Sequence, residues 1–103
     1  MPYAEVAVDA LIRGGRTFTY SIPSHLAVEP GQMVQVPFGP RMADGIVFEL
    51  STTTRIDFVR PIEASDGVGP VLTPSHLALA RWISDYYLAS LYAAASLMFP
   101  PGF

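Results

Sequence analysis

Apolar and polar residues alternate along much of the first half of the chain, and this alternation limits the fold more than any other feature of the sequence. In residues 3–10, Ala4, Val6 and Val8 fall on one face, and mostly polar residues fall on the other. A period of two is typical of a strand with one buried face. The pattern predicts four strands, in residues 3–10, 16–22, 28–36 and 44–50.

Glycine and proline mark the predicted turns between these strands. Gly14 and Gly15 predict a tight hairpin turn, because consecutive glycines accept the positive φ that such a turn needs. Pro30 followed by Gly31 is typical of a type II turn. Residues 58–62 predict a short fifth strand, which its proline would confine to an edge of the sheet.

The composition changes near residue 65, and helical features follow. Thr73 and Pro74 predict a capped helix start, and apolar residues recur at helical spacing up to about residue 88. The residues of that predicted buried face are Leu79, Ala80, Ile83 and Tyr87. We also expect the aromatic residues of this helix to pack it on the sheet; they are Trp82, Tyr86 and Tyr87. Residues 91–99 predict a second helix that Pro100 ends.

These elements predict one α+β domain over residues 1–103, β-rich in 1–64 and helical in 73–99. The expected fold is a small, strongly bent antiparallel sheet or open barrel of four to six strands, followed by two C-terminal helices. The apolar end of the sequence suggests the N-terminal piece of a longer chain.

Composition argues against several classes of function. The sequence contains neither cysteine nor lysine, its six cations are arginines and its net charge is −3. No phosphate-binding loop or nucleophile motif is present, so we expect neither catalysis nor a cofactor in this chain. No long apolar run or basic leader occurs, so we expect a cytoplasmic protein without a membrane partner. Any contact with nucleic acid must rest on a few placed arginines.

Aromatic and arginine side chains gather at the predicted turns. Arg16 and Phe18 follow the double glycine, and Phe38, Gly39 and Arg41 belong to the segment VPFGPR. Aromatic faces beside guanidinium groups can hold a nucleotide through stacking and phosphate contacts. The alternative is purely structural: both phenylalanines are in phase with core positions of their strands, and arginines are common on surfaces.

Several motifs in order resemble a known family. These are TFTY at residues 17–20, PGQMVQVPFG at 30–39, DGIVF at 44–48 and DYY at 85–87. In this order and spacing they resemble the N-terminal domain of the primosomal protein N′ family of replication-restart helicases.

The resemblance implies capture of the 3′ end of the nascent leading strand at a stalled fork. Carried over by position, the binding residues are Phe18, Thr19, Gly39 and Arg60, and we place Arg16, Phe38 and Arg41 at the rim. Family members commonly have aspartate where this chain has Thr19, and arginine replaces a lysine at position 60. A hydroxyl both donates and accepts, so it offers different contacts from a carboxylate.

The resemblance also implies the partners and cofactors of a longer protein. These are DNA, helicase domains further along the same chain, primosome and single-strand-binding proteins, and ATP, Mg and Zn bound outside this domain. An SH3-like module for protein or interdomain docking is the alternative function, and a small-molecule enzyme domain is a more distant one.

Overall fold

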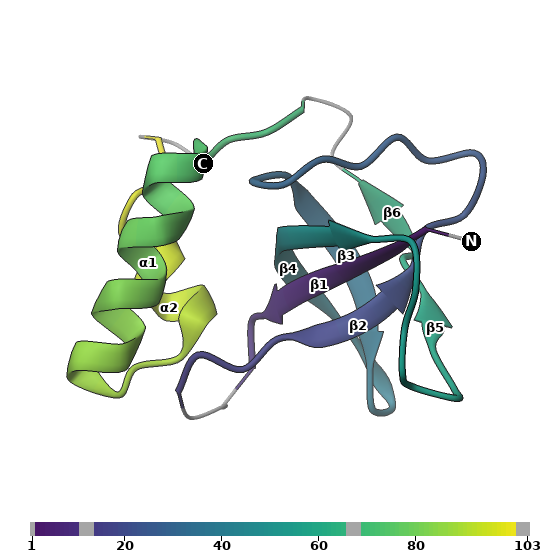
Figure 1. Cartoon of the computed structure of the whole chain (residues 1–103), viewed down its shortest axis with the longest axis horizontal. Helices are drawn as coiled ribbons and strands as arrows, with labels where there is room; N and C mark the ends of the chain where they lie inside the picture. The colour runs from purple at the N-terminus through teal and green to yellow at the C-terminus, as the bar shows by residue number, and fades with distance from the viewer. Residues whose placement is uncertain (1, 11–13, 66–68, 101–103) are drawn as a thin grey trace.

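The computed structural model describes residues 2–10, 14–65 and 69–100. Within these ranges, one sheet of six strands is followed by two helices (Figure 1). The elements are β1 (Tyr3–Val8), β2 (Phe18–Ser21), β3 (Met33–Phe38), β4 (Arg41–Ser51), β5 (Arg60–Pro61), β6 (Ala64–Ser65), α1 (Pro74–Tyr87) and α2 (Leu91–Ser96). The predicted α+β class, the strand number and the two C-terminal helices are confirmed.

The sheet curls until its two edges meet. The strand order is β5-β2-β1-β4-β3-β6, so β5 and β6 lie at opposite edges. Only Ile62 and Glu63 separate these two strands along the chain. The Ile62 N–H donates to the Ser21 carbonyl on β2 at 3.0 Å, and the Glu63 N–H donates to the Gln35 carbonyl on β3 at 2.8 Å. Two adjacent residues thus bond to both sides of the sheet, which closes it into a small barrel.

Pro61 lies in an edge strand, as predicted, but that strand runs parallel to its neighbour instead of antiparallel. β5 lies at an edge, where a proline without an N–H can be accommodated. It runs parallel to β2, and the other paired strands are antiparallel. The predicted all-antiparallel sheet is therefore wrong at this strand.

Two apolar cores lie on the two faces of the curled sheet. The barrel interior holds Ala4, Val6, Val8, Tyr20, Ile22, Val28, Val34, Val36, Ala43, Val47 and Ile62. The second core, between the sheet and the helices, holds Ala7, Ile46, Phe48, Leu72, Leu77, Ala80, Leu91, Ala94 and Ala95. Both faces of β1 and β4 are therefore buried, which explains the unbroken apolar run from Ile46 to Phe48 on β4.

The glycine turn predicted at Gly31 is confirmed. The Gln32 N–H donates to the Glu29 carbonyl at 3.2 Å, and Gly31 has φ 89°, as a type II turn requires. A Cβ on Gly31 would also lie 2.1 Å from the Leu72 carbonyl oxygen. The tight hairpin at Gly14 is wrong, because residues 9–17 separate β1 from β2. Residues 11–13 of that connection lie outside the described residues.

Helix α1 begins as predicted but turns a different face to the sheet. Thr73 is the N-cap, and His76 completes a capping box by accepting the Thr73 N–H at its Nδ1, at 3.1 Å. The buried residues are Leu77, Ala80 and Ser84, whereas Leu79 is 46% exposed and Tyr87 is 67% exposed. The predicted buried face is thus wrong at Leu79 and Tyr87.

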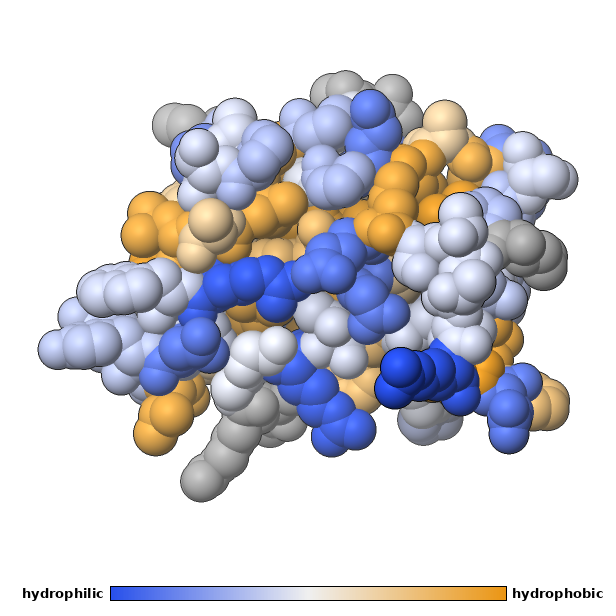
Figure 2. Space-filling model, in the orientation of Figure 1, coloured by the Kyte–Doolittle hydropathy of each residue, from blue (hydrophilic) through white to orange (hydrophobic). Residues whose placement is uncertain are grey.

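The predicted packing of the aromatic residues of α1 is also wrong. Trp82, Tyr86 and Tyr87 are all exposed, and the Trp82 and Tyr86 rings stack at 5.1 Å with 9° between their planes. Apolar surface also remains visible on the helical side of the molecule and over the sheet (Figure 2). Helix α2 ends at Ser96, so it is shorter than predicted. Neither helix of the described ranges is long and apolar enough to cross a membrane.

Candidate functional site

A cavity of about 330 Å³ opens beside the outer edge of β2. β5 pairs with Tyr20 and Ser21 of β2 and leaves Phe18 and Thr19 beyond the paired region. Three segments line the cavity. They are residues 16–20, residues 37–39 of the β3–β4 hairpin, and a segment that contributes Ile56, Phe58 and the first residue of β5, Arg60. We call this cavity the β2 pocket.

Two phenylalanines form the aromatic wall of the β2 pocket. The rings of Phe18 and Phe38 meet edge to face, with centroids 5.1 Å apart and planes at 76°. Both side chains are half-buried and pack against the barrel core. The Arg16 Cζ lies 5.0 Å from the centroid of the Phe18 ring, within the range of a cation–π contact. The wall is therefore anchored from behind and carries a cation at its edge.

Tyr20 supports this wall from inside the barrel. Its hydroxyl donates to the Pro37 carbonyl at 2.7 Å, which connects β2 to the turn that carries Phe38. Burial raises the pKa of Tyr20, and the nearby positive charge of Arg60 opposes that rise. Tyr20 therefore stays protonated near neutral pH and keeps the donor that this bond requires.

Gly39 and Arg60 also line the pocket, and a hydrogen bond connects them. Phe38 pairs with Arg41, which leaves Gly39 and Pro40 as a two-residue hairpin loop. Gly39 has φ 60°, as expected for glycine in the first position of a type II′ turn. Its carbonyl accepts a hydrogen bond from Arg60 Nη1 at 2.9 Å. This bond uses one of the five N–H donors of a guanidinium group.

Comparisons with known proteins identify the family of this chain. A family model described as the 3′ DNA-binding domain (3′BD) matches residues 5–100. The chain is 35% identical over 97% of its length to the replication restart protein PriA of Bacillus subtilis, and 33% identical over 98% to that of Synechocystis. The chain belongs to the PriA 3′ DNA-binding domain family. It spans 13% and 12% of the length of these two relatives.

The β2 pocket brings together all four residues that the resemblance to the primosomal protein N′ family assigned to binding. Phe18, Thr19, Gly39 and Arg60 all line it, although they come from three separate segments. Two of the three predicted rim residues, Arg16 and Phe38, line it as well.

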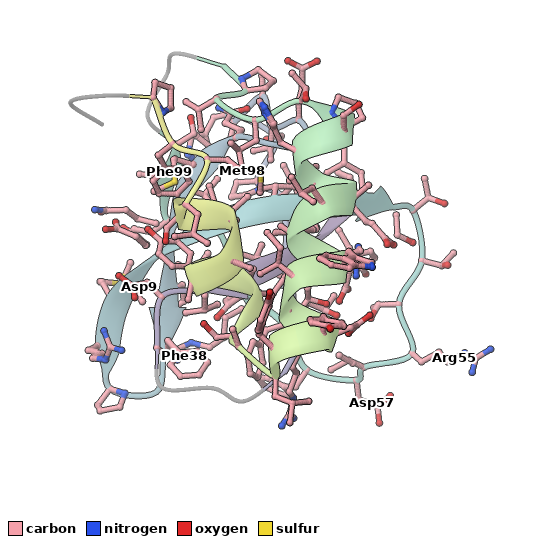
Figure 3. The ribbon with its side chains drawn as sticks, turned by 90° about the vertical axis from the view of Figure 1, so that its left-hand side faces the viewer. Asp9, Phe38, Arg55, Asp57, Met98 and Phe99 are labelled. Atoms are coloured by element: carbon pink, nitrogen blue, oxygen red, sulfur yellow. The ribbon has the colours of Figure 1, made fainter. Side chains whose placement is uncertain are left out.

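Arg41 lies outside the β2 pocket. Its Nη2 donates to the Asp9 carbonyl at 3.4 Å, and it lines a separate hollow with Asp9 and Asp44. Figure 3 shows Phe38 near the β3–β4 hairpin, whereas the Arg55 side chain extends from the loop before β5 into solvent. We therefore leave Arg41 out of the proposed site.

The threonine that departs from the family pattern has a carboxylate beside it. Thr19 is the cross-strand neighbour of Glu5 and donates its hydroxyl proton to Glu5 Oε2. Thr17 donates to the other carboxylate oxygen of Glu5 at 2.9 Å. Both threonines line the β2 pocket. A hydroxyl that donates one hydrogen bond keeps its two lone pairs, so each threonine oxygen can still accept a hydrogen bond from a ligand.

Sequence reasoning missed three side chains of this region. Ile56 and Phe58 line the pocket from the loop between β4 and β5, and Glu5 supports it from β1. The loop has no periodicity, and its one signal is an apolar pair within a polar segment. The role of Glu5 depends on the pairing of β1 with β2, which the alternation of either strand alone does not specify.

Proposed function

We propose that this domain is a non-catalytic module that captures the 3′ end of the nascent leading strand at a stalled replication fork. The observation that carries the proposal is the β2 pocket, where Phe18, Thr19, Gly39 and Arg60 line one cavity. The family description supports contact with a DNA 3′ end. The net charge of −3 argues for a local pocket rather than a broad cationic surface.

The terminal nucleotide would fit the chemistry of the three sides of the pocket. Its base would stack on the aromatic wall, a contact that contributes about 1–3 kcal/mol. Arg60 and Arg16 would pair with phosphate oxygens, and charge-assisted hydrogen bonds contribute roughly 1.5–3 kcal/mol each. Ordering of the strand offsets part of this sum. The balance predicts a dissociation constant on the order of micromolar.

The Thr19 hydroxyl would accept a hydrogen bond from the terminal 3′-hydroxyl of the strand. Because the Thr19 hydroxyl already donates a hydrogen bond to Glu5, its oxygen is left to act as an acceptor. A terminal phosphate at neutral pH would bring negative charge towards the Glu5 carboxylate. The site therefore favours an unmodified 3′ end.

The wider role extends the same proposal to a longer protein, since the chain spans 13% and 12% of the length of the two relatives named above. The domain would place the motor of an ATP-dependent 3′-to-5′ helicase at the fork, in the cytoplasm. Helicase domains of the same chain would bind ATP and Mg, and a further module would bind Zn. Primosome proteins and single-strand-binding proteins would be its partners.

The test uses fluorescence anisotropy with one short DNA strand that ends in a 3′-hydroxyl or a 3′-phosphate. We expect the phosphate to weaken binding by about tenfold or more. We expect Phe18→Ala to abolish binding, whereas Tyr86→Ala removes an exposed aromatic ring that does not line the pocket and leaves binding unchanged. Because Phe18 also packs on the core, Arg60→Glu gives a second, exposed test. Equal binding of both strand ends would contradict end capture.

The exposed apolar residues of α1 and of its C-cap favour a second candidate function, docking on another protein or domain. Trp82 is 57% exposed and Leu88 is 78% exposed. Large exposed apolar side chains of this kind are typical of interaction surfaces. If Arg60→Glu left DNA binding intact, this function would replace end capture.

A further inference from the structure

Phe58 is a large apolar side chain that the fold leaves almost wholly in solvent. Its side chain is 91% exposed, more than any other large hydrophobic residue of the described ranges. It nevertheless lines the β2 pocket, together with Ile56, which is 49% exposed. An exposed aromatic ring lacks the stabilisation that burial of its apolar surface would provide. A ring placed this way at the mouth of a pocket can regain that stabilisation when a ligand covers it.

The loop that carries Phe58 is held by its own side chains. The Ser51 hydroxyl donates to the Thr53 carbonyl at 2.7 Å and accepts the Thr53 N–H at 3.2 Å. The Thr54 hydroxyl accepts the Ile56 N–H at 3.1 Å. Bonds of this kind restrict a short loop to few conformations. Less conformational entropy is then lost when a ligand binds the loop.

The phenylalanines of the pocket differ in their surroundings. Phe18 and Phe38 are half-buried against the core and form the inner wall, whereas Phe58 stands at the exposed mouth. A strand that enters with its end first would place its terminal base against the inner wall. The neighbouring base would then lie at the mouth, where every base offers a face for stacking.

We propose that Phe58 forms a second base subsite, which stacks on the penultimate base of the captured strand without selecting its sequence. Ile56 contacts the edge of the same base. This inference rests on the proposed end-capture function, because the position of Phe58 relative to the strand follows from the terminal base in the inner pocket.

The test is a double-mutant cycle between the protein and the strand. The 103-residue chain and its Phe58→Ala variant are titrated with a short thymidine strand whose penultimate nucleotide carries its base or is abasic. We expect Phe58→Ala to weaken binding of the intact strand by about 5- to 150-fold. The abasic strand should bind both proteins equally, because the ring then has no base to stack on. Phe58→Trp should restore binding of the intact strand.

Leu50→Ala is the matched control, because Leu50 is 45% exposed and does not line the pocket. We expect it to change neither titration. Equal weakening of the intact and abasic strands by Phe58→Ala, or no weakening at all, would overturn the subsite. A circular strand separates the two proposals: if the wild-type chain binds it as tightly as the linear strand, end capture itself has failed.

Discussion

Arg60 Nη1 donates to the Gly39 carbonyl at 2.9 Å, although the two residues lie 21 positions apart in the chain. The bond connects β5 at one edge of the sheet to the β3–β4 hairpin, and both residues line the β2 pocket. Arg60 thus orders one wall of the pocket while its guanidinium group faces the cavity as a cation. A substitution that reverses the charge of Arg60 should therefore remove both the hydrogen bond to Gly39 and the cation in the pocket.

Arg60→Glu should weaken binding of a 3′-ended strand by at least about tenfold, since it removes one charge-assisted contact and adds repulsion. Arg55→Glu makes the same charge change on an exposed residue outside the pocket lining and should have little effect. Anisotropy titrations of both variants at one salt concentration give the comparison. Equal losses would indicate a general electrostatic surface and contradict a pocket.

Gly39→Ala tests the conformation of the hairpin. A Cβ at Gly39 would meet no atom within 4 Å, so the cost arises from φ 60° rather than from a clash. A left-handed conformation costs an L residue about 1–2 kcal/mol. We expect a loss of about 1 kcal/mol in the free energy of unfolding, measured by chemical denaturation, together with weaker DNA binding.

Gly14→Ala is the control for this strain. Gly14 has φ 73°, its Cβ would also meet no atom within 4 Å, and it lies outside the pocket lining. The two variants should lose similar stability, and only Gly39→Ala should lose affinity. If both lost affinity alike, the effect would belong to stability and not to the site.

Much of the fold could be predicted because its strands follow a simple period. β1 lies within the predicted segment 3–10, and β4 extends beyond both ends of the predicted segment 44–50. The proline in β5 correctly predicted an edge strand. β6 has only two residues, too few to show a period, so the closure of the barrel through Ile62 was missed.

The orientation of α1 could not be read from the hydrophobic pattern because a serine lies at the centre of its buried face. Ser84 is fully buried, and its hydroxyl donates to the Ala89 carbonyl at 2.6 Å, which removes the cost of an unpaired polar group. With Ser84 inward, the larger aromatic side chains turn outward. The site was predicted only as far as the family resemblance reached, since neither Glu5 nor Phe58 belongs to a quoted motif.

Glu5→Gln should reduce the preference for a 3′-hydroxyl over a 3′-phosphate. The carboxylate accepts hydrogen bonds from Thr17 and Thr19, whereas an amide also donates and can reverse the direction of one of these bonds. We expect the ratio of the two dissociation constants to fall, because phosphate repulsion is also removed. A purely structural role of Glu5 would weaken both strands equally and leave the ratio unchanged.

Glu49→Gln is the matched control for Glu5→Gln. Glu49 is the cross-strand neighbour of Glu5 on β4, so its substitution changes the same charge at nearly the same place. Its carboxylate pairs with Arg81 at 2.8 Å, whereas Thr17 and Thr19 of the pocket donate their hydrogen bonds to Glu5. We expect the ratio of dissociation constants to stay at the wild-type value in this variant.

Tyr92 predicts a loss of stability at alkaline pH. Burial, with the negative charges of Asp9 and Asp44, raises the pKa of Tyr92 from 10.0 to about 12. Because the folded pKa is the higher one, the unfolded chain releases its proton first as pH rises. This contribution to stability is complete below pH 10 and is lost between about pH 10 and 12. Denaturation midpoints measured across this range should fall less steeply in Tyr92→Phe, and an unchanged slope would contradict the assignment.

Salt dependence distinguishes a pocket from a cationic surface without any substitution. A captured end offers roughly three phosphates to Arg16 and Arg60 and to nearby backbone N–H groups. For single-stranded DNA, each contacted phosphate adds about −0.7 to the slope of log affinity against log salt concentration. A plot of log affinity against log salt concentration should therefore have a slope of about −2. A slope steeper than about −5 would require more phosphate contacts than the pocket can provide. Since the chain carries six arginines and a net charge of −3, we expect the shallow slope.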